Sequence, residues 1–295
     1  MKKDSFIHSI LYMIASATSL SLVGLFGRIG FASFSLPTIL LVRFLGSFLI
    51  SSVLVFFFKQ WEKPKFNLIR KNAIRAFFVL GSQYSFFYYI QKDSLMNATA
   101  LLNTGPFFVP LIAWTIFREK IDRATWIGLS ISFIGVLCII QPESSLFSWS
   151  SLIGLFAGFC QGISQVLFGL HAKEKKSYLN IFYLFLFCSI GAFIPYAFWD
   201  LCCDLPKHFL WTNVLLFVFL GIASVCNQSF RAAAYKIDKP SRLSAFLYFS
   251  VLFSGVLDWV VFHKGPNLLS FLGAFLIVSG GTLKTALFLK SESKH

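Results

Sequence analysis

The residues of this sequence that could do chemistry are a few charged and polar side chains within long apolar stretches. Asp258 is the only carboxylate well inside such a stretch. Ser250, Ser254 and Asp258 recur every four residues, so a helix would place them on one polar stripe. Arg28 and Arg43 are basic residues expected at a similar depth. An ion pair between Asp258 and either arginine would hold one end of the molecule closed, with a purely structural pair, or snorkelling of Arg28, as the alternative.

Amide side chains form a second group of candidates. Asn227 and Arg231 are spaced i and i+4 and share a helix face, and Gln228 lies beside Asn227. Gln83 is the equivalent of Gln228 in an internal repeat. Two amides related in this way are natural ligands for a polar solute, and plain hydrogen bonds between helices are the alternative.

Aromatic and further amide side chains complete the candidate site. Aromatic rings stack on a nucleobase or hold a sulfonium or ammonium group by cation–π attraction, although most rings in a chain that is 18% aromatic must face lipid or pack helices. Gln161 and Gln165 lie on a helix face that also carries Gly158, Gly162 and Gly169, and such a face admits either a close helix or a solute. The candidate substrate-binding residues are Gln83, Tyr84, Tyr88, Asn103, Phe107, Gln161, Gln165, Asn227, Gln228 and Tyr248, and the candidates for gating or charge pairing are Arg28, Arg43, Asp258 and Arg231.

The elements that must position these residues follow from the composition. Of the 295 residues, 57% are hydrophobic and 13% are charged, and the mean hydropathy is +0.73. These values exclude most soluble enzymes, disordered proteins and fibrous repeats. Because about 20 apolar residues of helix cross a bilayer, the sequence predicts an all-α polytopic membrane protein with ten transmembrane helices. The expected spans are 8–30, 36–58, 73–91, 98–117, 124–141, 150–171, 179–200, 212–234, 241–262 and 267–289.

The positions of the basic residues predict the orientation of the spans. The formal charge of +14 comes from 26 Lys and Arg against 12 Asp and Glu. If the N-terminus is cytoplasmic, most basic residues between the spans face the cytoplasm, and Lys92, Lys207 and Lys264 face outward. This bias predicts a multi-pass protein of the cell inner membrane with both termini in the cytoplasm. The same bias explains most of the excess of basic over acidic residues, so no nucleic-acid partner is expected.

An internal repeat is the most informative feature of the sequence. The chain aligns with itself without gaps at an offset of 145 residues. The identical pairs include Gln83 and Gln228, Trp114 and Trp259, Gly128 and Gly273, and Gly135 and Gly280. The chain is therefore expected to have two five-helix halves, 1–145 and 146–295. Because five is odd, the halves would be inverted relative to each other, which is the architecture of many alternating-access transporters.

The run ATALLNTGPFFVPLIAWTIFREKIDRATWIGLSISFIGV, residues 98–136, resembles the end of a repeat in the drug/metabolite transporter (DMT) superfamily, EamA type. The matching features are Pro106 and Pro110, the turn Arg118-Glu119-Lys120, and Trp126. The second repeat departs from the pattern with His263-Lys264-Gly265 at its turn. The resemblance covers essentially the whole chain, and it implies ten spans in two five-helix halves and the transport of a metabolite.

A narrower likeness concerns the substrate. The whole chain, with its high Phe and Lys usage, resembles the S-adenosylmethionine transporters of this family in obligate intracellular bacteria. That resemblance implies uptake of S-adenosylmethionine, in exchange for S-adenosylhomocysteine. Export of amino acids or of drugs and metabolites, a flippase for a lipid-linked sugar, and a channel are the alternatives. Only one carboxylate, Asp258, lies within a span and is available for proton coupling. This favours exchange or facilitated transport of the solute over proton symport.

Catalytic and metal-binding motifs are missing from the sequence. There is no HExxH motif, no P-loop and no pair of carboxylates at catalytic spacing, so the chain is not expected to be an enzyme. The six cysteines show no metal-ligand spacing. No metal and no cofactor are therefore expected. The expected partners are a small-molecule substrate and the lipid bilayer, and a homo-oligomer is compatible with the sequence.

Overall fold

The computed structural model describes residues 3–63, 66–92, 94–118, 123–140, 149–171, 177–199, 211–263, 268–269, 272–273 and 275–280. Within these ranges every regular element is a helix. The elements are α1 (Lys3–Gly30), α2 (Leu36–Phe57), α3 (Phe66–Ile90), α4 (Leu95–Leu102), α5 (Gly105–Phe117), α6 (Arg123–Ile140), α7 (Trp149–His171), α8 (Ser177–Trp199), α9 (Trp211–Ile237), α10 (Pro240–Leu243), the 3₁₀ helix η1 (Ser244–Tyr248) and α11 (Phe249–Phe262). Glu119, Lys120, Lys207, Lys264 and the two chain ends, on which the sequence carried expectations, lie outside the described residues.

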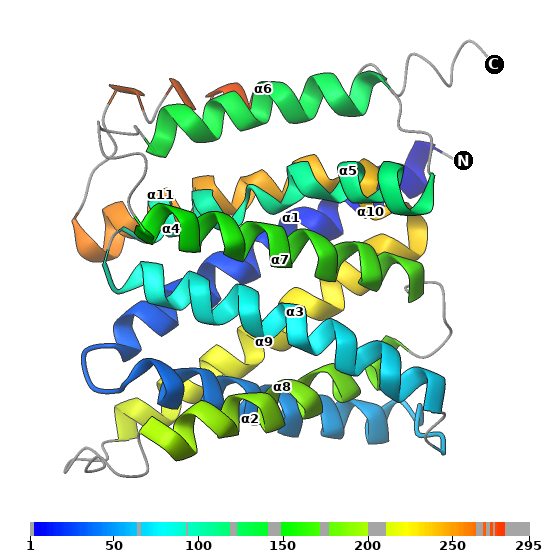
Figure 1. The fold of residues 1–295 in the computed structure, drawn as a ribbon, viewed down its shortest axis with the longest axis vertical. Helices are drawn as coiled ribbons and strands as arrows, with labels where there is room; N and C mark the ends of the chain where they lie inside the picture. Colours follow the sequence, from blue (N-terminus) through cyan, green and yellow to red (C-terminus); the bar gives the residue numbers. More distant parts are fainter. Residues whose placement is uncertain are drawn as a thin grey trace.

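The helices are stacked in layers along the long axis of the molecule (Figure 1). Helices α2 and α8 form one end of the stack and α6 the other, with α1, α3, α7 and α9 between them. The main packing pairs are α1 with α9, α2 with α8, and α3 with α7. The buried side chains of the largest apolar cluster therefore come from both halves of the sequence.

Seven described segments are long and apolar enough to cross a membrane. They are Phe6–Gly30, Leu36–Phe57, Leu95–Ile116, Leu152–Leu170, Ser177–Phe198, Asn213–Ile237 and Pro240–Phe262. The chain is therefore an all-helical membrane protein, as the sequence predicted. The expected span 73–91 lies in α3, which begins seven residues earlier and includes Arg70 and Lys71 in its first turns. That helix is not among the seven. The expected span 124–141 lies in α6, where only the shorter apolar segment Thr125–Gly135 is found, and most of the expected span 267–289 lies outside the described residues.

Two of the expected spans are interrupted helices. In the fourth span α4 ends at Leu102, and α5 begins after a short turn with Pro106 in its first positions, where a missing backbone N–H costs nothing. In the ninth span α10, η1 and α11 follow one another from Pro240 to Phe262. Breaks of this kind free backbone groups at membrane depth, and they are tolerated where protein covers them. The structure thus has a helix break in each half of the chain.

The structure repeats itself at the offset found in the sequence. Helices α4 and α5 begin and end at Leu95 and Phe117, and α10 and α11 begin and end 145 residues later. The residues that follow, Arg118 and His263, both adopt a left-handed backbone conformation, with φ of 50° and 55°. Packing repeats as well: α1 packs on α9 and α11 as α7 packs on α3 and α5. The chain therefore consists of duplicated halves.

Glycines set the closest helix contacts. A Cβ on Gly135 would lie 2.6 Å from the carbonyl oxygen of Gly273, and a Cβ on Gly280 would lie 2.6 Å from that of Gly128. These two contacts are equivalent under the 145-residue repeat. Only a residue without a side chain allows two helix backbones to approach so closely.

The glycine face of α7 packs against neighbouring helices. A Cβ on Gly158 would lie 2.8 Å from the carbonyl oxygen of Leu101, and one on Gly162 would lie 2.9 Å from Cβ of Phe108. On Gly169 it would clash with the ring of Pro240. Of the two interpretations left open by the sequence, the structure supports a close helix rather than space for a solute.

Candidate functional site

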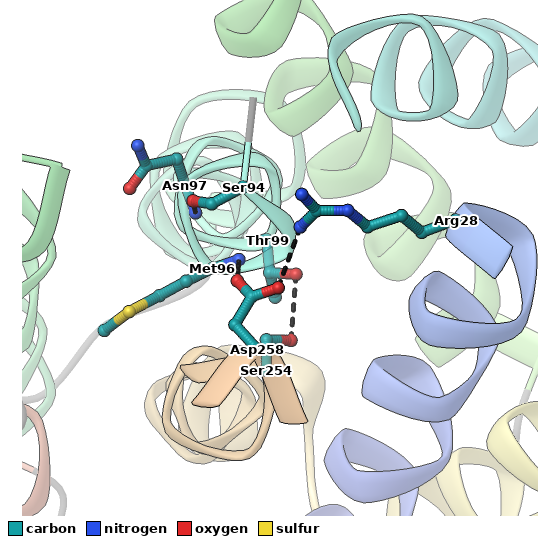
Figure 2. A network of polar contacts seen from close by, with 7 residues as sticks. All are labelled: Arg28, Ser94, Met96, Asn97, Thr99, Ser254 and Asp258. Carbon is teal, nitrogen blue, oxygen red and sulfur yellow. Dashed lines mark hydrogen bonds and ion pairs between the residues drawn. The ribbon is translucent and has the colours of Figure 1, made fainter. Parts of the chain in front are cut away.

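Asp258 forms the ion pair that the sequence predicted with one of two arginines, and its partner is Arg28. Arg28 Nη1 donates to Oδ1 of Asp258 at 2.8 Å, and the backbone N–H of Met96 donates to Oδ2 at 2.8 Å (Figure 2). The Arg28 guanidinium also lies 4.4 Å from the ring centre of Phe262. The pair connects the C-terminal end of α1 and the start of α4 to α11, so it joins the two halves of the chain.

The polar stripe of α11 faces α4 along its length. Ser254 shares a hydrogen bond of 3.0 Å with Thr99, and Ser250 Oγ accepts from Asn103 Nδ2 at 2.7 Å. Asn103 Nδ2 also donates to the carbonyl oxygen of Thr99. The stripe predicted from the four-residue spacing is therefore present. Its side chains form a row of contacts between helices. The Asn103 amide, a candidate for substrate binding, is one of the hydrogen-bonding groups in this row.

Arg43 has different partners from those of Arg28. Its Nε donates to Ser224 Oγ at 2.8 Å, and its Nη1 donates to Gln83 Oε1 in a short hydrogen bond. The rings of Phe44 and Phe87 lie 5.2 and 5.4 Å from the guanidinium carbon. Arg43 thus links α2 to α3 and α9, and it takes no part in the contacts of Asp258.

Arg75 is a second buried arginine, and it contacts Gln228, the amide that the repeat relates to Gln83. Its Nη2 donates to Gln228 Oε1 at 2.6 Å, and its guanidinium lies 3.6 Å from the ring centre of Phe168. Gln83 and Gln228 are the two amides related by the repeat. Each accepts a hydrogen bond from an arginine of another helix.

Arg231 is the most buried of three arginines in this region and the least satisfied. It is 2% exposed, compared with 6% for Arg43 and 4% for Arg75. Its Nε and Nη2 atoms have no hydrogen-bond partner among the described residues, and neither does Nε of Arg75. Arg75 and Arg231 are close enough for their charges to repel each other. Tyr235 lies within electrostatic reach of both and donates to Gln165 Oε1 at 3.2 Å.

No carboxylate compensates these three positive charges in the described part of the chain. The electrostatic neighbours of these guanidinium groups are Cys188 for Arg43 and Arg75 and Tyr235 for Arg75 and Arg231, and Arg231 is also a neighbour of Arg75. Asp258 pairs with Arg28, and Asp238 pairs with Arg242 at 3.6 Å. The described helices therefore enclose an excess of buried positive charge around these three arginines.

Two further predicted amides make contacts between helices. Asn227 Nδ2 donates to the carbonyl oxygen of Ser16 at 2.7 Å, and Ser16 Oγ donates back to the carbonyl oxygen of Asn227 at 3.1 Å. Gln161 Oε1 accepts from Ser82 Oγ at 3.5 Å. Asn227 thus holds α1 against α9.

Tyr84 and Tyr88 are a turn apart on α3 but have unrelated contacts. The hydroxyl of Tyr84 donates to the carbonyl oxygen of Ala192 in α8 at 3.5 Å. Tyr88 accepts from Lys92 Nζ at 2.6 Å near the end of α3, and this lysine also lies 4.5 Å from its ring centre. A shared stacking surface made by these two rings is not supported.

Phe107 and Tyr248 pack against apolar and aromatic neighbours. Phe107 stacks on Phe133 of α6 at 5.3 Å between ring centres. Tyr248 is fully buried in an apolar cluster with Ala100 and Leu129, and its hydroxyl has no hydrogen-bond partner among the described residues. The predicted aromatic lining is therefore distributed over several helix contacts.

Sequence reasoning missed four residues of the arginine region: Arg75, Cys188, Ser224 and Tyr235. Arg75 carried a usable signal, because it is an ionisable residue inside the expected span 73–91. The other three are of types that commonly pack between helices, and only their neighbours distinguish them.

Comparisons with known proteins agree with this architecture. Residues 7–141 and 148–284 match the model of the EamA-like transporter family. A pseudopaline exporter of Pseudomonas aeruginosa is 28% identical over 204 residues, which cover 68% of this chain and 70% of that protein. A riboflavin transporter of Brucella anthropi is 28% identical over 199 residues, covering 65% and 67%. One solved crystal structure matches at a TM-score of 0.73 over 97% of this chain and 99% of that chain, with 13% identity, which supports the fold alone.

Proposed function

This chain belongs to the EamA-like transporter family, and from that premise we propose that it moves its solute by alternating access between two inverted five-helix halves. It is a secondary transporter of small metabolites and not an enzyme. The ten proposed spans divide near residue 145 into two halves of five. Because five is odd, the second half starts on the opposite side of the membrane from the first, and the two halves are inverted. The packing supports this arrangement, because α1 of the first half packs on α9 of the second half and α7 of the second half packs on α3 of the first.

The observation that carries the proposal is the placement of the two repeat-related amides. Gln83 and Gln228 lie on α3 and α9, and each accepts a hydrogen bond from a buried arginine. Buried polar side chains at the contact between halves are expensive in a membrane and mark the solute path. We assign the path to the region of Arg43, Arg75 and Arg231.

The Arg28–Asp258 pair closes one end of this path. It ties α1 and α4 to α11, and its loss frees the second half to move relative to the first. The distribution of basic residues supports an orientation in which this end faces the outer side of the inner membrane and both termini lie in the cytoplasm. The structure then represents a form closed at the outer end.

S-adenosylmethionine uptake in exchange for S-adenosylhomocysteine remains a specific prediction. The carboxylate of S-adenosylmethionine suits the buried arginines. An aromatic ring stabilises a sulfonium by cation–π attraction. The predicted rings contact different helices, and Phe168, which was not among them, lies beside Arg75. Riboflavin enters as a second candidate, because relatives of this chain are riboflavin transporters. Amino-acid export and a lipid-linked sugar flippase remain alternatives.

Counterflow in proteoliposomes tests the proposed function. Liposomes holding the purified protein are loaded with an excess of one unlabelled solute, and entry of a trace of the labelled solute is followed. S-adenosylmethionine, riboflavin and a mixture of amino acids form the panel. We expect one solute to show a saturable transient overshoot, because a carrier exchanges labelled for unlabelled solute. Entry that is linear in concentration and unaffected by preloading would contradict a carrier and favour a channel.

A further inference from the structure

Three buried guanidinium groups define a positively charged region without a countercharge. Arg43, Arg75 and Arg231 are each at most 6% exposed. Transfer of an ionised group from water into an apolar interior costs many kcal/mol unless an opposite charge compensates it. The partners present are neutral amide and hydroxyl oxygens and aromatic rings. These partners stabilise each cation but leave the net charge of the region positive.

Unused hydrogen-bond donors lie within this region. Nε and Nη2 of Arg231 and Nε of Arg75 are buried with no acceptor among the described residues. A buried donor without an acceptor loses its bonds to water and gains nothing in return. Natural structures retain few such groups, and those retained call for an explanation such as a role in binding an ion.

The two arginines with free donors are neighbours from different halves of the chain. Arg75 lies on α3 and Arg231 on α9, and their like charges repel each other. Arg231 is one turn from Tyr235, which is also within electrostatic reach of Arg75. An anion between the two guanidinium groups would turn this repulsion into two attractions.

We propose that Arg75 and Arg231 bind the anionic group of the transported solute, a carboxylate or a phosphate monoester. This inference rests on the proposed function, since it names the class of solute that the path accepts. Guanidinium groups recognise the oxygens of both anions through paired, charge-assisted hydrogen bonds. Arg43, which like Arg75 is close to Cys188, adds to the positive field. A solute whose only charge is positive is repelled by the same field.

Thermal unfolding of the purified protein in detergent, at constant ionic strength, tests the inference. The probes are succinate and glutamate for carboxylates, and inorganic phosphate and glycerol 3-phosphate for phosphates, with succinamide and glycerol as uncharged analogues. The variants are R231Q, R231K and the control R123Q, which makes the same change at an exposed arginine at the start of α6. Stabilisation by the carboxylates or by the phosphates identifies which of the two anionic groups the site binds.

We expect at least one anion, and neither uncharged analogue, to raise the unfolding temperature of the wild type and of R123Q. In R231Q the concentration needed for half of that effect should rise about 10- to 100-fold, because one charged hydrogen-bonding partner is lost. R231K should lie between, since an ammonium keeps the charge but loses the paired geometry. Because R231Q removes an unpaired buried charge, its own unfolding temperature without probe should not fall, which separates ligand loss from misfolding.

The inference is wrong if no anion in the panel stabilises the wild type more than R231Q. It is also wrong if an uncharged or purely cationic solute shows counterflow that R231Q leaves unchanged, although the proposed transport function then stands. If instead the anions stabilise the protein through Arg231 but no solute shows counterflow, the anion site stands and the transport proposal fails.

Discussion

Replacing Arg75 with methionine is expected to reduce solute counterflow about 10- to 100-fold, because the solute loses one guanidinium partner. The variant should also unfold more readily. Gln228 Oε1 loses its donor at 2.6 Å, and a buried acceptor left without a partner costs about 1–3 kcal/mol. Both losses come from a single side chain, so a second substitution is needed to separate them.

Arg75→Met combined with Gln228→Leu provides that separation. Removing both partners of a buried hydrogen bond is close to neutral for stability, whereas removing one is not. The double variant should therefore recover the unfolding temperature lost by Arg75→Met, while counterflow stays low. Recovery of counterflow together with stability would show that Arg75 has only a structural role. The exposed Arg123→Met serves as the matched control and should leave both properties unchanged.

Asp258→Asn is expected to open the end of the molecule that the Arg28–Asp258 pair closes. An asparagine oxygen still accepts the backbone N–H of Met96, but it no longer pairs with the Arg28 charge. Loss of a largely buried charge pair shifts the balance between two conformations by about 1.4 kcal/mol or more, which is a factor of about ten in their populations. Thr99, buried beside Ser254 below the pair, is then reached by solvent more often.

Labelling of Thr99→Cys by a membrane-impermeant thiol reagent measures this opening. The background is a protein whose native cysteines are replaced and which still shows counterflow. We expect the labelling rate to rise about tenfold in Asp258→Asn, and also in Arg28→Gln. Equal labelling with and without the pair would contradict a gating role and leave a purely structural ion pair. Asp258→Ala, which also removes the acceptor of the Met96 N–H, should be less stable than Asp258→Asn.

The parts of the fold and site that the sequence predicted depend on local periodicity. Ser250, Ser254 and Asp258 share one face because four residues complete about one helical turn, and their neighbours on α4 are polar as expected. The expected depth of each residue in the membrane limited the partner of Asp258 to two arginines, Arg28 and Arg43. Choosing between Arg28 and Arg43 required the packing of α1 against α11, which no local pattern specifies.

The parts that were missed depend on tertiary contacts or on the interior of a span. Arg75 lies two residues inside the expected span 73–91, and its side-chain partner Gln228 is 153 residues away in the sequence, so no local pattern indicates the pair. Tyr88, Phe107 and Tyr248 were grouped as rings for one solute, yet each packs with a different set of neighbours. In a chain with 38 phenylalanines, residue type carries little information about which ring faces a site.

The internal repeat supplies the residues for the most direct test of alternating access. Thr99 in α4 and Ser244 in η1 are related by the 145-residue offset, and both are at most 1% exposed. If the halves are inverted, these residues lie on the path to opposite sides of the membrane. Each can be replaced by cysteine in the same cysteine-free background.

The decisive measurement compares the labelling rates of Thr99→Cys and Ser244→Cys, with the Arg28–Asp258 pair intact and with Asp258→Asn. Alternating access predicts opposite changes: breaking the pair raises the rate at Thr99→Cys and lowers it at Ser244→Cys, because opening one end closes the other. Rates that rise together at both positions would contradict the account, since they would indicate a path open at both ends or a general loosening of the fold.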